Sequence, residues 1–164
     1  MFKWFQQRKQ DQAKLTRAYD VGQRIVQQFE GELEAQIDRY ELVFDEFIVM
    51  LQTELNRCLL PGKVPTLIDA NIRFHVFLEN IDKLHDKMVE DLTSALSSWF
   101  EIDNDFSEEF DRVIRLKAQD FRKGLVETGL ERFTEMQYAL QIADDEWRAE
   151  NPDLSARYPR KTER

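Results

Sequence analysis

Residues 15–59 carry most of the structural information in this chain, and they read LTRAYDVGQRIVQQFEGELEAQIDRYELVFDEFIVMLQTELNRCL. Three sets of mostly apolar residues recur there at intervals of eleven residues. The sets are Leu15, Val26, Ile37, Ile48 and Leu59; Ala18, Phe29, Tyr40 and Leu51; and Gly22, Leu33, Phe44 and Leu55. An eleven-residue repeat has about 3.67 residues per turn, so its apolar seam runs almost straight along an α-helix. The repeat therefore predicts one long helix over about residues 6–60, with a seam of the coiled-coil kind.

The segment that follows predicts the end of this helix and the start of the next. Residues 61–65 read PGKVP, and two prolines and a glycine so close together stop a helix. Thr66 then stands three residues before Asp69, which is the spacing of a capping box at a helix N-terminus. We expect a turn here and a second helix from about residue 67.

Apolar residues spaced by three and four predict that the second helix covers about 67–102 and a third covers about 106–149. The sequence IDND at 102–105 predicts the interruption between them, because Asp and Asn favour helix caps over helix interiors. This run contains neither Gly nor Pro, so one unbroken helix over 67–149 stays an alternative. Asn151-Pro152 predicts the end of the third helix, and residues 152–164 are expected to form a mobile basic tail.

These segments predict an all-α fold, an elongated antiparallel three-helix bundle in a single domain over residues 1–151. The three helices would have about 55, 36 and 44 residues, or roughly 82, 54 and 66 Å at 1.5 Å per residue. The long first helix would then overhang the other two, so that about its first 20 residues lack partners within the chain.

The charge distribution argues against nucleic acid as a partner. The chain has a net charge of −9, and residues 25–110 contain 19 acidic residues against six basic ones. Residues 1–24 are basic, with six Lys and Arg against two Asp. Binding to nucleic acid depends on clustered Lys and Arg that neutralise phosphates, and an acidic body does not supply them.

No set of residues has the pattern of a catalytic or metal site. A carboxylate-bridged metal site in a helical bundle needs Glu and E-x-x-H groups that point inward from several helices. The nearest match is Asp82 with His85, beside His75 and Glu79. His75, Glu79, Asp82 and Asp86 lie almost opposite the apolar face of their helix. Cys58 follows the pattern of a small core residue. We therefore predict that the chain is not an enzyme and holds no metal, cofactor or small-molecule substrate.

Apolar residues left over from the seams predict a partner-binding surface instead. Leu15 and Ala18 belong to the overhanging part of the first helix, and further apolar residues lie off the seams of all three helices. The predicted partner-binding residues are Leu15, Ala18, Leu42, Val49, Ile72, Val76, Val126 and Leu130. Because apolar patches at one level of a fold mark contact surfaces, the favoured function is a non-enzymatic interaction or assembly module. The expected partner is a second copy, most simply in a homodimer, or another helical protein.

Two alternatives remain open. The first segment combines aromatic and basic residues, namely Phe2, Lys3, Trp4, Phe5, Arg8 and Lys9, and such a segment can bind a membrane interface or a protein. The chain would then be a peripheral membrane protein. The other alternative is a subunit of a larger enzyme complex. No stretch reaches the roughly 20 apolar residues of a membrane span, and the opening MFKWFQQRKQ lacks the apolar core of a signal peptide, so we expect a cytoplasmic location.

Overall fold

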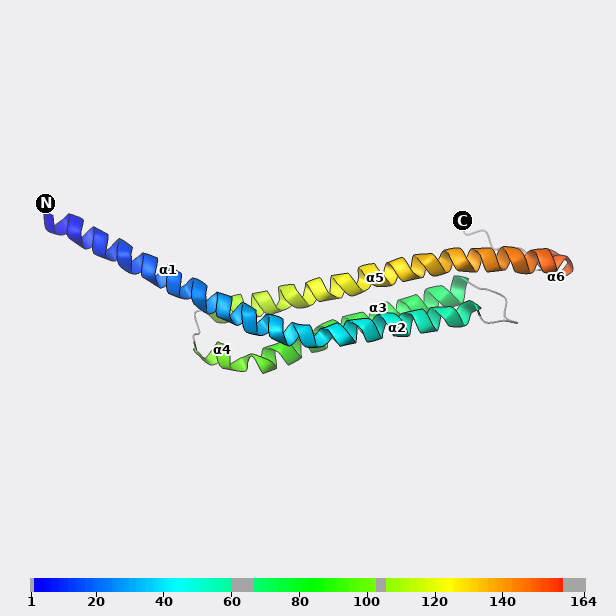
Figure 1. Cartoon of the computed structure of the whole chain (residues 1–164), viewed down its shortest axis with the longest axis horizontal. Helices are drawn as coiled ribbons and strands as arrows, with labels where there is room; N and C mark the ends of the chain where they lie inside the picture. Colours follow the sequence, from blue (N-terminus) through cyan, green and yellow to red (C-terminus); the bar gives the residue numbers. More distant parts are fainter. Residues whose placement is uncertain (1, 60–66, 103–105, 158–164) are drawn as a thin grey trace. The chain divides into compact units, whose positions relative to one another are not determined.

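The structure is a computed structural model that describes residues 2–59, 67–102 and 106–157. Almost all of these residues are helical, and this part of the chain contains no strand, so the prediction of an all-α fold is confirmed. Figure 1 shows the helices along the sequence. Their bounds are α1 (Phe2–Ile37), η1 (Asp38–Tyr40), α2 (Glu41–Asn56), η2 (Arg57–Leu59), α3 (Leu67–Ala95), α4 (Ser97–Ile102), α5 (Ser107–Glu150) and α6 (Pro152–Arg157).

The helix predicted over 6–60 is present as four consecutive elements. They are the α-helices α1 and α2 and the two short 3₁₀ helices η1 and η2. At η1 the backbone stays in the right-handed helical region on both sides, and the amide of Glu41 donates to the carbonyl of Asp38. A 3₁₀ turn tightens the winding without ending the helical path. At the other end, η2 tightens the last turn up to Leu59. The predicted turn over 61–65 and its capping residue Thr66 lie outside the described residues.

The second predicted helix, over 67–102, is divided at Leu96 into α3 and α4. The hydrogen bonding hardly changes at this point. The Leu96 amide donates to the Leu92 carbonyl, and the Trp99 amide donates to the Leu96 carbonyl, both at 3.0 Å. The interruption predicted at 102–105 falls on residues 103–105, which lie outside the described residues. On either side, α4 ends at Ile102 and α5 begins at Ser107.

The C-terminal prediction needs a correction. Helix α5 ends at Glu150, one residue from the predicted end, but residues 152–157 form helix α6 where we expected part of a mobile basic tail. Proline suits the first position of a helix because its missing N–H would have no partner there and its φ angle is already helical. The Asn151 side chain also donates to the Trp147 carbonyl at 2.9 Å and connects the end of α5 to the start of α6. Residues 158–164 lie outside the described part.

The chain divides into two compact units, residues 1–41 with 88–118 and residues 42–87 with 119–164. We call them unit one and unit two and describe each by itself. The single domain over 1–151 stays a prediction.

An aromatic cluster forms the centre of unit one. The Phe29 and Phe110 rings are stacked with centroids 4.2 Å apart, and both side chains are fully buried. Trp99 meets each ring edge-on at 5.9 Å, and its indole N–H donates to Glu32 at 2.8 Å. The aliphatic residues buried in this unit are Leu33, Met88, Leu92, Leu96, Val113, Ile114 and Ala118.

The core of unit two draws on α2, α3 and the second part of α5, which run side by side (Figure 1). Phe74 stacks on Phe133 with ring centroids 4.4 Å apart. Cys58 is 7% exposed and belongs to this core, so the prediction of a small core residue is confirmed. The buried core residues are Leu51, Leu55, Cys58, Ala70, Phe77, Ile81, Leu125, Phe133, Met136 and Leu140.

Candidate binding groove between α2 and α3

A groove of about 360 Å³ lies between α2 and α3 in unit two. Two core residues line it, Leu51 from α2 and Phe77 from α3, and they are almost fully buried. Helix α3 contributes a stripe at steps of three and four residues, a spacing that places side chains on one face of a helix. The stripe consists of Asp69, Ile72, Arg73, Val76 and Asn80, and α2 adds Met50 and Glu54.

Apolar side chains with open surface make up much of the groove. Met50 is 42% exposed, Val76 48% and Ile72 58%, although all three are large hydrophobic residues. Buried side chains of this size stabilise a protein by about 1.5–3 kcal/mol each. An apolar partner that covered the groove would therefore gain free energy from these three positions.

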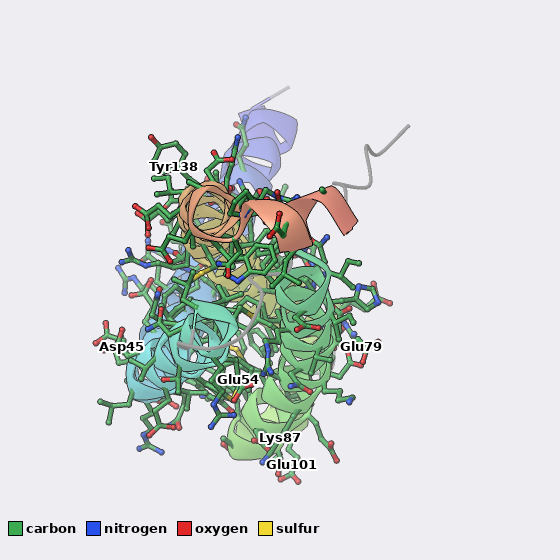
Figure 2. All side chains as sticks on the ribbon, turned by 90° about the vertical axis from the view of Figure 1, so that its right-hand side faces the viewer. Asp45, Glu54, Glu79, Lys87, Glu101 and Tyr138 are labelled. Atoms are coloured by element: carbon green, nitrogen blue, oxygen red, sulfur yellow. The ribbon has the colours of Figure 1, made fainter. Side chains whose placement is uncertain are left out.

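Charged groups cross the groove at one point. The Glu54 carboxylate accepts hydrogen bonds from Arg57 in η2 and from Arg73 on α3. Figure 2 shows Glu54 between α2 and α3, whereas Asp45 and Glu79 point outward from the two helices. The side chains of Glu54 and Arg73 are 33% and 32% exposed, so water screens this ion pair only in part.

Arg73 retains one unsatisfied donor. Its Nε is buried, and among the described residues no acceptor lies within hydrogen-bond distance of it. A buried donor without a partner costs about 1–3 kcal/mol. The groove thus combines apolar walls with a fixed guanidinium and two carboxylates, which are those of Glu54 and Asp69.

Two of the predicted partner-binding residues of unit two line the groove, and the others do not. Ile72 and Val76 line the groove. Leu42 and Val49 are 74% and 64% exposed on α2 but do not line it, and Leu130 is 51% exposed on α5. The exposed position expected for Val126 is wrong. Val126 is half-buried and packs against the core of unit two.

In unit one, the apolar seam of α1 continues beyond the core. Phe29 and Leu33 are fully buried, but Leu15 is 70% exposed and Ala18 is also exposed. Val21 and Tyr19 add exposed area at 55% and 66%. Tyr19 and Val21 were not among the predicted partner-binding residues.

The N-terminal aromatic and basic segment begins helix α1. The side chains of Phe2, Lys3, Trp4, Phe5, Arg8 and Lys9 lie outside the described part of the structure. Their binding to a membrane or to a protein therefore stays a prediction.

The His and carboxylate stripe of α3 faces away from the core. His75, Glu79 and Asp82 have side chains that are 76%, 58% and 59% exposed, and Asp82 accepts a hydrogen bond from Arg122. Among the described side chains, no three His, Cys, Asp or Glu residues are close enough together to hold a metal ion. Within the same residues, none of the helices has both the length and the apolar character that crossing a bilayer demands.

Sequence reasoning assigned no role to most of the groove. It gave Asp69 a role only in capping the second helix, and it did not single out Glu54, Arg73 or Asn80. The signal was present, because the five residues of the α3 stripe share one helical face. The ion pair between Glu54 and Arg73 depends on how α2 packs against α3. The spacing of residues within one helix gives no information about that packing.

Comparisons with protein-family models, with curated proteins and with solved structures find no match to this chain.

Proposed function

We propose that this chain is a non-enzymatic helical assembly module that associates with a second copy of itself. The single observation that carries the proposal is the exposed continuation of the α1 seam. The same repeat that buries Phe29 and Leu33 completely leaves Leu15 70% exposed. An apolar seam with the regular spacing of a helix–helix contact, which no helix among the described residues covers, fits an interface with another chain.

The free energy gained by burying the exposed apolar side chains is large enough to offset the cost of association. Leu15, Tyr19, Met50, Ile72 and Val76 are all large and at least 42% exposed. Full burial of one such aliphatic side chain is worth about 1.5–3 kcal/mol, whereas association costs about 4–15 kcal/mol. Several of these side chains together are needed for a stable pair. A two-fold homodimer is the commonest arrangement that uses one surface twice.

The proposal includes the architecture expected from the sequence, an elongated antiparallel three-helix bundle whose first helix overhangs the other two. Each unit's core draws on three helical segments, which supports this arrangement. The maximum dimension measured by small-angle X-ray scattering tests it. We also propose a cytoplasmic location, which fluorescence microscopy of a tagged chain would test.

Light scattering coupled to size exclusion tests self-association directly. The full chain at micromolar concentration is expected to show twice its mass of 19.6 kDa. Leu15→Glu should shift the mass toward that of the monomer, because a charge on the seam would have to lose its water in the interface. Gln27→Glu is the matched control, since it adds the same charge to an exposed position of the same helix. A wild-type mass of 19.6 kDa at every concentration would refute the proposal.

A further inference from the structure

We infer that the exposed segment of α1 at residues 14–24 binds the interface of a bilayer that contains anionic lipids. The inference goes beyond the proposed self-association, because it assigns a ligand to basic side chains that the apolar seam does not use. It stands on two features of unit one alone. The segment has positive charge without a partner among the described residues, and it has exposed apolar side chains beside that charge.

The basic side chains follow one side of the segment. Lys14, Arg17 and Arg24 are exposed and are three and seven positions apart, a spacing that keeps them on one side of a helix. The ion pairs between described residues give none of the three a carboxylate partner. Asp20 is the one acidic residue of the segment, so the segment is net positive in a chain whose net charge is −9.

The exposed apolar side chains lie beside these basic residues. Leu15 and Ala18 are three positions apart on the neighbouring side of α1, and Leu15 is 70% exposed. Tyr19 adds an aromatic ring, a side chain whose apolar body and polar tip suit the boundary between lipid and water. A helix with one apolar face and a polar face rich in Lys and Arg is typical of segments that lie in a membrane interface.

An anionic bilayer is the ligand that uses both features. Its headgroups attract Lys and Arg, and the acyl boundary beneath them takes up apolar side chains. Nucleic acid supplies the negative charge, but contacts with its phosphates would leave Leu15 in water. A second copy of this segment covers the apolar side chains but leaves the basic ones unpaired. The cytoplasmic leaflet of cell membranes carries anionic lipid, so this ligand is compatible with the proposed location.

The acidic part of unit one is far enough along α1 to allow this contact. The first acidic residue after Asp20 is Glu30, which is 16 positions from Lys14. At 1.5 Å per residue this is about 24 Å, whereas salt at physiological ionic strength screens charges over about 8 Å. Repulsion between the bilayer and Glu30 is therefore weakest at Lys14 and grows toward Arg24. We expect the segment to bind with its Lys14 end nearer the membrane.

Flotation of the full chain with lipid vesicles tests the inference. The vesicles contain phosphatidylcholine alone or phosphatidylcholine with phosphatidylserine. At low ionic strength we expect binding to the anionic vesicles to be at least about tenfold stronger than binding to the neutral ones, and high salt should release the chain. A chain that does not float with the anionic vesicles, or that floats equally with both kinds, would overturn the inference.

A charge-matched pair of double variants locates the contact. Lys14→Gln with Arg17→Gln should weaken binding to the anionic vesicles at least about tenfold. Arg39→Gln with Lys87→Gln is the control, because it lowers the net charge equally at exposed positions outside the segment. The control should bind within about twofold of the wild type. Equal weakening by both double variants would mean that overall charge decides binding, and the inference would fail.

A third double variant tests the apolar side chains. Leu15→Gln with Tyr19→Gln keeps every charge and removes two exposed apolar side chains. We expect it to weaken binding to the anionic vesicles at least about tenfold, because apolar area contributes to interfacial binding. Unchanged binding would show adsorption through charge alone and would overturn the placement of α1 in the interface.

Light scattering without lipid keeps this inference separate from the proposed function. The Lys14→Gln/Arg17→Gln variant should keep the wild-type mass, because the apolar seam is intact, while it loses vesicle binding. A wild-type chain that is monomeric in solution but floats with anionic vesicles would refute self-association and support the membrane contact. A dimeric chain that does not float would do the reverse.

Discussion

The Phe77 ring occupies the space in which a side chain at position 129 would lie. A Cβ added to Gly129 would stand 2.3 Å from Phe77 Cε1, far inside van der Waals contact. Phe77 is 2% exposed, packs in the core of unit two and also lines the α2–α3 groove. Gly129 on α5 therefore leaves room for the Phe77 ring of α3, and a larger residue at position 129 would exclude that ring.

Gly129→Ala is expected to destabilise the protein. Overpacking of a core costs typically about 1–3 kcal/mol, which exceeds the roughly 1 kcal/mol that Ala gains over Gly in a helix. Chemical denaturation monitored by circular dichroism measures the free energy of unfolding. An increase in stability would show that Phe77 moves aside without cost.

Gly31→Ala is the matched substitution with the opposite expected sign. Gly31 lies within α1, and an added Cβ would meet nothing within 4 Å. Alanine restricts the unfolded chain and suits a helix, so we expect a gain of about 0.5–1 kcal/mol. The same denaturation experiment checks this. A loss of stability would contradict the open environment of Gly31.

Phe29→Ala tests the aromatic cluster of unit one. The side chain is fully buried and touches both Phe110 and Trp99, so its truncation should cost about 3–5 kcal/mol. Tyr138→Ala removes an aromatic ring of similar size that is 70% exposed and points outward in Figure 2, and it should cost less than about 0.5 kcal/mol. Equal effects in thermal melts would mean that Phe29 does not hold unit one together.

The sequence predicted the helices and their inward faces because both depend on local spacing. The eleven-residue repeat correctly placed Phe29, Leu33, Leu51 and Leu55 in the interior. It also placed Gly22 on the seam, and in the structure the Phe106 ring lies against this glycine.

One difference from prediction arises where distant residues meet, and the others arise where the local sequence carries no clear signal. The half-burial of Val126 depends on the core that α2 and α3 form against α5. The 3₁₀ turn at Asp38–Tyr40 and the break at Leu96 leave no Gly or Pro signal in the sequence. Helix α6 begins at a proline that we took as a stop signal, although the same residue also suits the first position of a helix.

A double-mutant cycle on Glu54 and Arg73 measures the ion pair that crosses the groove. Glu54→Ala should cost about 1–2 kcal/mol, because it leaves a half-buried guanidinium without its carboxylate. Arg73→Met removes the charge and the unsatisfied Nε together, so we expect a change within about 1 kcal/mol. The double variant should recover about 1 kcal/mol relative to the sum of the single changes.

Arg57→Ala is the control for this cycle. Arg57 binds the same carboxylate, but its side chain is 55% exposed, and exposed ion pairs contribute little. Its loss should change the free energy of unfolding by less than about 0.5 kcal/mol. Strictly additive effects of Glu54→Ala and Arg73→Met would show that the pair across the groove contributes nothing.

The last prediction concerns the pH dependence of unit one through Tyr40. Its hydroxyl donates to Asp91 Oδ2 at 3.2 Å, across from η1 to α3. Burial, and then the charge of Asp91 and this hydrogen bond, raise the pKa of Tyr40 above its usual value of 10.0. The fold therefore favours the neutral phenol. The stability that the neutral Tyr40 hydroxyl contributes is complete below about pH 10 and is lost as the pH rises through the raised pKa.

Wild type and Tyr40→Phe should consequently differ by a nearly constant free energy of unfolding from about pH 8 to about pH 9, and the wild type should lose that advantage at higher pH. Phenylalanine keeps the ring but has no proton to lose, so the difference between the two curves isolates the Tyr40 hydroxyl from every other group that titrates in alkali. Tyr19→Phe is the control, because Tyr19 is 66% exposed. Parallel curves for the wild type and Tyr40→Phe up to about pH 11 would contradict the raised pKa.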